Sequence, residues 1–342
     1  MKKNLFLLLF VLLSKSIWAS FVYLPMDHDN QKNHLKSYGI VYYALQNGLK
    51  AKWLLNYDGG AFLIENNEAV VKECKIRGVS FEVISDAKSQ LILEEISSPS
   101  KNQEAVTLEK APKIAVYSPK DKLPWDDAVT MVLTYAEIPF DVIYDEEVLD
   151  EKLLLYEWLH LHHEDFTGQY GRFYGPYRTA PWYIQRKKRA EDLATKLGFD
   201  KVSQEKLAVA KKIRDYVIGG GFMFAMCSAT DSFDIALSAE GVDICEAMFD
   251  GDASESNYTS KIDYDRTFAF KDYSLIRDPT VYEFSSIDMT RKRKIQKESD
   301  YFILREFSAK WDQVPTMLCQ NHTQVVKAFM GQTTSFDHKH IK

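Results

Sequence analysis

Short apolar runs alternate with amphipathic helical patterns along the first part of the chain. Apolar runs bounded by turn residues predict strands, and apolar positions spaced three and four residues apart predict helices. These patterns predict strands over 21–24, 51–57, 61–64 and 79–84. They predict helices over 31–45, 68–77 and 87–96. This part is therefore expected to form a small N-terminal α/β block.

A second block follows the polar linker at 97–103. Its predicted strands lie over 114–117, 140–143 and 156–162, and its predicted helices over 126–136, 184–197 and 204–218. Strands separated by helices of this length favour a mostly parallel sheet with helices on both faces. Short β additions are expected near the C-terminus, over 268–270, 282–284 and 301–304. The fold class is thus α/β, with blocks at 21–110 and 111–342.

The segment 1–20 has the composition of a secretory signal peptide. Lys2 and Lys3 precede the apolar stretch 5–13, and 16–19 is a suitable cleavage site before Ser20. The apolar stretch is too short to span a bilayer, and no later segment is long or apolar enough to do so. We expect an exported protein, periplasmic or extracellular, without an integral membrane anchor after cleavage.

The charge of the chain argues against a nucleic-acid partner. Its formal net charge is −6, and loss of the signal segment removes three lysines and no acid, which gives −9. The runs Arg186–Arg189 and Arg291–Lys294 are basic but short, and we interpret them as solvated faces. The expected ligand is a small molecule, a peptide or a carbohydrate.

A cysteine stands where the last predicted strand of the sheet passes into a helix. Three glycines at 219–221 precede the apolar run 222–226, and Cys227 follows it. The carboxyl end of such a strand opens into the ligand crevice, and the N–H groups of a helix N-terminus stabilise a thiolate or an oxyanion. This context predicts Cys227 as a nucleophile. The residues expected to bind the oxyanion or the ligand are Gly220, Gly221, Ser228 and Ala229.

Two other interpretations of Cys227 remain open at this level, a buried inert thiol and a disulfide. The remaining cysteines are Cys74, Cys245 and Cys319, which are too few and too scattered for a disulfide scaffold. No pair has the Cys-x-x-Cys spacing of zinc and redox sites.

Histidines and carboxylates gather at the end of the strand predicted over 156–162. His163, Glu164 and Asp165 follow this strand, and parallel topology brings them to the sheet edge that carries Cys227. A histidine held by a carboxylate can take the proton of a thiol, so these residues complete a candidate Cys-His-acid site. Metal binding by His160, His162 and His163 is an alternative, as is a structural role. The spacing fits no common metallohydrolase motif, and we predict neither a metal nor a cofactor.

Three segments carry a resemblance to a known family. They begin at Lys113 (KIAVY), Trp158 (WLHLHHEDFTGQY) and Gly219 (GGGFMFAMCSATD). They resemble the exported Bacteroidota proteins commonly labelled asparagine synthetase B. The resemblance implies a class I glutamine amidotransferase-like domain over 111–342, with a flavodoxin-like sheet and a cysteine at a sharp strand-to-helix turn.

The chain also departs from the chemistry of those names. Asparagine synthesis is not expected, because residue 2 is a lysine and no Ser-Gly-Gly-x-Asp-Ser loop for ATP is present. Ala225 and Ala229 replace the two elbow glycines of class I glutaminases. No His-x-Glu pair follows Cys227, where the histidines are His322, His338 and His340. Relatives continue beyond Phe336, which raises truncation at the C-terminus as one interpretation.

The expected function is that of an exported, thiol-dependent hydrolase of an amide, peptide or carbohydrate-derived substrate. The alternatives are a non-catalytic envelope binding module and a metal-dependent hydrolase. Aromatic residues follow the His-Glu-Asp run in a loop that contains Gly and Pro, and such rings suit sugar or peptide contacts or simply pack the loop. They are Tyr170, Tyr174, Tyr177 and Trp182.

Overall fold

The computed structural model describes residues 20–119, 128–289, 301–303, 309–310, 325–327 and 336–342. The proposed signal segment before Ser20 therefore lies outside the described residues, as do Cys319 and His322. The chain divides into two compact units. The N-terminal unit comprises mainly the residues up to Ala111, and the C-terminal unit begins at Pro112.

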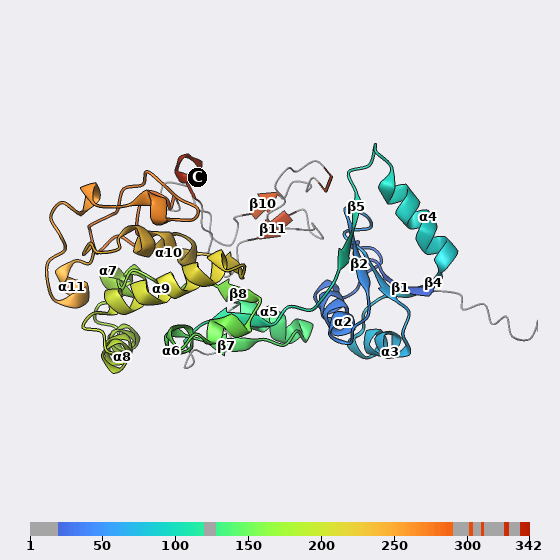
Figure 1. The fold of residues 1–342 in the computed structure, drawn as a ribbon, viewed down its shortest axis with the longest axis horizontal. Coiled ribbons are helices and arrows are strands. Elements are labelled where there is room, and N and C mark those ends of the chain that lie inside the picture. The colour runs from blue at the N-terminus through green and yellow to red at the C-terminus, as the bar shows by residue number, and fades with distance from the viewer. Residues whose placement is uncertain (1–19, 120–127, 290–300, 304–308, 311–324, 328–335) are drawn as a thin grey trace, which may run out of the picture. The chain divides into compact units, whose positions relative to one another are not determined.

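The N-terminal unit is a five-stranded sheet with helices on both faces (Figure 1). Its strands are β1 (Ser20–Leu24), β2 (Ala51–Leu55), β3 (Phe62–Glu65), β4 (Glu82–Ser85) and β5 (Glu104–Leu108). Its helices are α2 (His34–Gln46), α3 (Glu68–Arg77) and α4 (Asp86–Ser97). The strand order is β4-β1-β3-β2-β5, and every pair is antiparallel. The block thus mixes helices and strands as expected, but no parallel pair forms in it.

Alternation along the strands explains the two cores of this unit. Val22 and Ile64 pair across β1 and β3 and pack with residues of α2 and α3, whereas Tyr23 and Leu63 point to the other face, toward α4. Successive side chains of a strand point to opposite faces of the sheet. The sheet therefore buries apolar side chains on both sides.

The rest of the chain begins with alternating strands and helices. These are β6 (Ile114–Tyr117), α5 (Ala128–Ala136), β7 (Asp141–Ile143), α6 (Asp145–Leu149), η2 (Lys152–Leu155) and β8 (Trp158–Leu161). Next come η3 (Tyr170–Arg172), α7 (Tyr174–Tyr177), α8 (Pro181–Lys196), α9 (Val202–Ile218), β9 (Phe222–Ala225) and α10 (Ser228–Ser238). The final elements are α11 (Ala247–Asp250), η4 (Tyr258–Ser260), η5 (Tyr264–Arg266), β10 (Tyr301–Ile303), β11 (Val325–Lys327) and η7 (His338–His340).

The sheet of the C-terminal unit confirms the α/β prediction. Its four strands are all parallel, in the order β7-β6-β8-β9. Numbered within the unit this order is 2-1-3-4, which matches the first four strands of the flavodoxin-like order. In that arrangement ligands bind beyond the carboxyl ends of the strands. Tyr117, Leu161 and Ala225 mark those ends.

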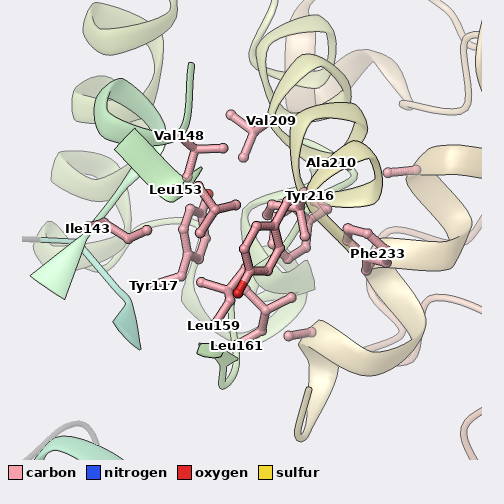
Figure 2. Packing of buried hydrophobic residues seen from close by; sticks show 14 of the residues in the cluster. Tyr117, Ile143, Val148, Leu153, Leu159, Leu161, Val209, Ala210, Tyr216 and Phe233 are labelled. Atoms are coloured by element: carbon pink, nitrogen blue, oxygen red, sulfur yellow. The ribbon is translucent and has the colours of Figure 1, made fainter. Parts of the chain in front are cut away.

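One face of the parallel sheet carries the core of this unit. Figure 2 shows Tyr117, Leu159 and Leu161 pointing from the strands toward the helices that cover them. Val209, Ala210 and Ile213 of α9 and Phe233 and Leu237 of α10 are buried in the same cluster. This packing fixes the start of α10, because Ala229 is buried two residues after Cys227.

The β additions beyond residue 243 are only partly as expected. Phe270 and Ser285 form isolated bridges, with Ile341 and Leu275, and neither 268–270 nor 282–284 is a strand. Their β-type composition serves core packing, since Phe270 and Phe284 are buried together. Of the segment predicted over 301–304, residues 301–303 form β10, which pairs with β11, and residue 304 lies outside the described residues. Among the described helices, none combines the length and the apolar composition needed to cross a membrane.

Candidate functional site

Cys227 lies in a strained turn between β9 and α10. Its φ is 52° and its ψ is −139°, a left-handed conformation that costs a non-glycine residue about 1–3 kcal/mol. A strand-to-helix turn of this kind exposes a nucleophile above the sheet. Cys227 is partly exposed and forms no disulfide with Cys74 or Cys245, the other cysteines that the structure describes. Ser228 and Ala229 open α10, where backbone N–H groups have no intrahelical acceptor.

The histidine segment lies directly beside this turn. The amide of Met226 donates to the carbonyl oxygen of Leu161 at 2.9 Å, which extends the β8–β9 pairing to the edge of the sheet. The Ser228 hydroxyl donates to the carbonyl oxygen of His163 at 2.9 Å. One turn later, the Ser232 hydroxyl donates to the carbonyl oxygen of Glu164 at 3.1 Å. The structure therefore brings together the two segments that carry the predicted chemistry.

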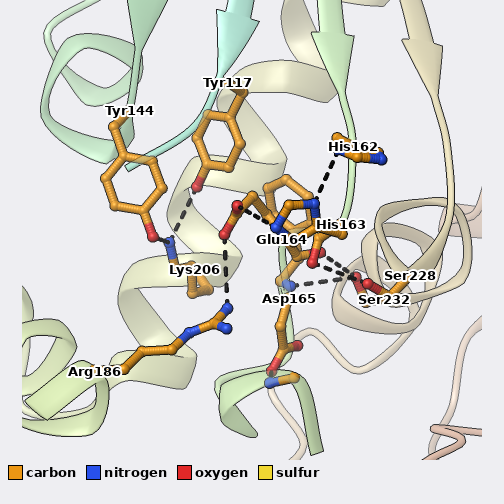
Figure 3. A network of polar contacts seen from close by, with 12 residues as sticks. Tyr117, Tyr144, His162, His163, Glu164, Asp165, Arg186, Lys206, Ser228 and Ser232 are labelled. Carbon is orange, nitrogen blue, oxygen red and sulfur yellow. Dashed lines mark hydrogen bonds and ion pairs between the residues drawn. The ribbon is translucent and has the colours of Figure 1, made fainter. Parts of the chain in front are cut away.

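His163 stands between a second histidine and a buried carboxylate. Its Nδ1 lies 3.0 Å from Nδ1 of His162, and its Nε2 lies 3.8 Å from Oε1 of Glu164 (Figure 3). Glu164 is buried, and its other oxygen lies 3.9 Å from a guanidinium nitrogen of Arg186 in α8. His163 itself is partly exposed. The arrangement is a histidine pair with the carboxylate of Glu164 beside it.

Asp165 has a different role from its neighbour. Its carboxylate accepts hydrogen bonds from the Thr167 amide at 2.7 Å, the Thr167 hydroxyl at 2.6 Å and the Gly171 amide at 2.9 Å. These contacts fold the loop that follows β8. Of the two predicted acids, Glu164 approaches the histidine, and Asp165 holds the loop.

Tyr282 interacts electrostatically with Cys227. The residue is 45% exposed, partial burial raises its pKa, and Cys227 and Asp288 raise it further. The segment before Tyr282 is held by Arg172, which is 2% exposed. Arg172 donates to the carbonyl oxygens of Ile276 at 2.8 Å, Asp278 at 2.5 Å and Val281 at 2.9 Å.

A buried polar cluster lies at the carboxyl ends of β6 and β7. Lys206 of α9 donates to Asp145 at 2.5 Å and to the hydroxyls of Tyr117 and Tyr144 at 3.1 Å each (Figure 3). Burial alone would lower the pKa of Lys206, but Asp145 and the tyrosines raise it well above its ordinary value. Burial also raises the pKa of the adjacent Glu205 to about 8, and Asp145 adds to that effect.

Gly220 and Gly221 are not brought to this site. They form the turn from α9 into β9, at the opposite end of the strand from Cys227. Gly220 has a φ of 100°, and a Cβ on Gly221 would lie 2.2 Å from the ring of Tyr216. The predicted ligand contact of Gly220 and Gly221 is therefore corrected: they shape the turn that leads into β9.

The three histidines of the metal interpretation do not converge. His160 is buried and stacks on Phe224 with ring centroids 5.5 Å apart. Within the described part of the chain, three potential metal ligands meet only at Asp243, Cys245 and Asp250. There the ammonium of Lys201 lies 2.7 Å from Asp243 and 3.0 Å from Asp250 and so supplies the positive charge.

Two further cysteines and one further histidine of the described residues have buried, structural surroundings. Cys74 is buried in the N-terminal unit, where burial raises the pKa of its thiol to about 12. Burial also raises the pKa of Cys245 well above its ordinary value. His340 is buried, with Nε2 2.9 Å from the Ser286 hydroxyl.

Sequence reasoning missed two members of the site. The sequence suggests His162 as a metal ligand or a structural residue, whereas in the fold its Nδ1 lies 3.0 Å from Nδ1 of His163. Arg186 belongs to a basic run that the sequence indicates to be a solvated face, but its guanidinium lies 3.9 Å from the buried Glu164. The chain has no match among protein-family models, curated proteins or solved structures.

Proposed function

We propose that this protein is a glutamine amidotransferase-like hydrolase that uses Cys227 to cleave an amide bond. The observation that carries the proposal is the strained backbone of Cys227 at the start of α10, directly beside the loop of His163 and Glu164. Strained backbone persists where surrounding structure over-determines it, and it gathers at functional sites. A thiol at a helix N-terminus next to histidines is the setting of a reactive cysteine.

The residues support a two-step reaction. The histidine pair accepts the thiol proton, and Cys227 attacks the carbonyl carbon of the amide. The Ser228 and Ala229 N–H groups bind the oxyanion that forms. When the C–N bond breaks, the amine leaves with the proton held by the histidine pair, and an acyl thioester remains. Water then attacks the thioester while the same histidines take its proton, which releases the acid and restores the thiol.

Glu164 has an electrostatic role in this scheme. A buried carboxylate beside His163 stabilises the positive charge that the imidazole acquires when it takes the proton. Arg186 limits that effect because it shares the carboxylate from the other side. We therefore assign Glu164 the orienting role and leave Asp165 to the loop.

Thiol reactivity tests the proposal directly. Alkylation by iodoacetamide is followed by peptide mass spectrometry at pH 6 to 8, with glutathione as the reference thiol. Cys227 is expected to react faster than glutathione at pH 6, and His163→Ala is expected to remove that excess. His338→Ala is the matched control, because His338 is exposed and belongs to η7. A Cys227 that is no more reactive than glutathione, or that is unaffected by His163→Ala, contradicts the proposal and favours a binding module.

We also propose that the protein is exported. The first described strand, β1, begins at Ser20, the residue that follows the expected cleavage site. Mass spectrometry of the intact protein from the culture medium or periplasm should give an N-terminus at Ser20. Retention of 1–19 in that protein would refute cleavage at this position.

A further inference from the structure

Four aromatic side chains form a connected surface on the C-terminal unit. They are Phe173, Tyr177, Trp182 and Tyr282, and we call them the aromatic platform. The Trp182 ring lies 5.1 Å from Tyr177 and 5.7 Å from Phe173 between centroids, and Phe173 lies 5.7 Å from Tyr282. Tyr177, Trp182 and Tyr282 are 42%, 45% and 45% exposed. Exposed rings that gather in this way mark a binding surface more often than scattered ones.

The loops that carry the platform are fixed by contacts of their backbone. Arg172 fixes the segment before Tyr282 through three backbone carbonyls. A Cβ on Gly175 would lie 2.7 Å from the carbonyl oxygen of Thr280, so the loops carrying Phe173 and Tyr282 touch backbone to backbone. Only glycine permits that approach. The rings therefore keep a defined spacing without a ligand.

The platform adjoins the histidine loop beside Cys227. The guanidinium of Arg186 lies 5.7 Å from the centre of the Phe173 ring and 3.9 Å from Glu164. The hydroxyl of Ser228, the residue after Cys227, donates to the carbonyl oxygen of His163 at 2.9 Å. A ligand resting on the rings would thus extend toward the histidine loop and the turn of Cys227.

Two charges near the platform are neutralised. The guanidinium of Arg186 lies 3.9 Å from the carboxylate of Glu164. Burial raises the pKa of Asp231, one turn after Cys227, well above its ordinary value, and Asp288 raises it further, which favours the uncharged acid. The four side chains of the platform themselves carry no charge, so they offer ring faces and tyrosine hydroxyls to a ligand.

We propose that the aromatic platform binds a neutral saccharide and that the substrate of Cys227 is an amide carried on such a sugar. The C–H face of a pyranose ring stacks on an exposed aromatic face while its hydroxyls stay hydrated or bond to tyrosine hydroxyls. An apolar peptide side chain gains more from a closed pocket than from an open surface. This inference rests on the proposed hydrolase function only for the position of the reacting amide.

Saccharide binding is measured on Cys227→Ser, so that the result does not depend on thiol chemistry. The probes are chitotetraose and cellotetraose, with acetyl-tetra-alanine amide as the peptide probe, each titrated by isothermal calorimetry. At least one saccharide is expected to bind, and Trp182→Ala is expected to weaken it about tenfold. Trp182→Phe should retain most of the affinity because it keeps a ring.

Phe222→Ala is the matched control. Phe222 is similarly exposed but begins β9, at the opposite edge of the sheet. Its loss should leave saccharide affinity unchanged, and circular dichroism of all variants checks that each one folds. Absence of binding by both saccharides, preference for the peptide, or equal affinity of Trp182→Ala and the parent overturns the inference.

The two proposals fail separately. If Cys227 is reactive but no saccharide binds, the hydrolase proposal stands and the saccharide proposal is refuted. If a saccharide binds but Cys227 is unreactive, the platform proposal stands and the hydrolase proposal is refuted.

Discussion

Lys206→Met tests how much the ion pair between Lys206 and Asp145 stabilises the C-terminal unit. Lys206 is 5% exposed and Asp145 is 1% exposed, and they are 2.5 Å apart. Methionine keeps most of the apolar stem but removes the ammonium. Asp145 then stays buried without a cation beside it, although the Tyr117 hydroxyl still donates to it. Because removal of one member of a buried ion pair costs about 3–5 kcal/mol, we expect a loss of about 3 kcal/mol in the unfolding free energy of this unit.

Hydrogen exchange resolved by mass spectrometry is the suitable assay, because two units need not unfold together. Peptides covering β6 and β8 report on the core that contains Tyr117. Lys212→Met is the control, since Lys212 lies on the same helix but forms an exposed pair with Glu151 at 2.7 Å, and it should show no measurable change.

The double variant Lys206→Met with Asp145→Leu separates charge from packing. It should recover most of the stability, because exchange of both partners for apolar residues leaves no uncompensated charge. A loss of unfolding free energy below about 1 kcal/mol in Lys206→Met, or no recovery in the double variant, would refute the conclusion that Asp145 is a buried carboxylate stabilised by the Lys206 ammonium.

Four further changes test other parts of the structure. Arg172→Met should destabilise the C-terminal unit by about 3 kcal/mol and speed exchange over 276–282, whereas the exposed Arg178→Met should not. Glu205→Gln should flatten the pH dependence of stability. Because the pKa of Glu205 is raised to about 8, the wild-type protein loses stability as the pH rises from about 4.5 toward 8. Urea unfolding at pH 8.5 should therefore find the variant more stable than the wild-type protein. Gly168→Ala places a Cβ 2.7 Å from the Ser203 backbone and should lower the unfolding free energy by about 3 kcal/mol. Gly198→Ala, whose Cβ would meet no atom within 4 Å, should lower it by about 1 kcal/mol. Equal melting temperatures of the two variants would contradict this. Cys227→Gly should be more stable than Cys227→Ala by about 1 kcal/mol, because glycine accepts a φ of 52° without strain, and thermal unfolding decides the order.

Much of the element pattern follows from local signals. The helix predicted over 68–77 is confirmed at both ends, because Asn67 caps its first turn and Gly78, with a φ of 69°, ends it. The antiparallel direction of the N-terminal strands is not a local property, since β1 pairs with β3 and β4. β5 was missed because it has no buried residue, so no apolar run marks it.

The site was predictable where it depends on sheet topology. Parallel strands end at one edge, so Cys227 and His163 could be expected to approach from their positions after two strands. The different roles of Glu164 and Asp165 could not be expected, because two adjacent acidic residues are indistinguishable at the level of sequence. Only the tertiary fold decides that one faces His163 and Arg186 and the other binds the Thr167 and Gly171 amides.

The turn of Cys227 keeps a strained backbone that a different residue would relieve. Eight non-glycine residues of the described chain have positive φ, and three of them are Cys227 at 52° and, in the loop after β8, Tyr170 at 52° and Arg172 at 53°. Each of the three is held by burial nearby: Ala229 anchors the turn of Cys227 in the core, Tyr170 packs against Tyr183, and Arg172 binds three carbonyls. Such strain has a cost that tertiary contacts must offset. A turn that needed only stability could place glycine at 227, where a φ of 52° carries no strain, so the cysteine at this position supports the proposed reaction.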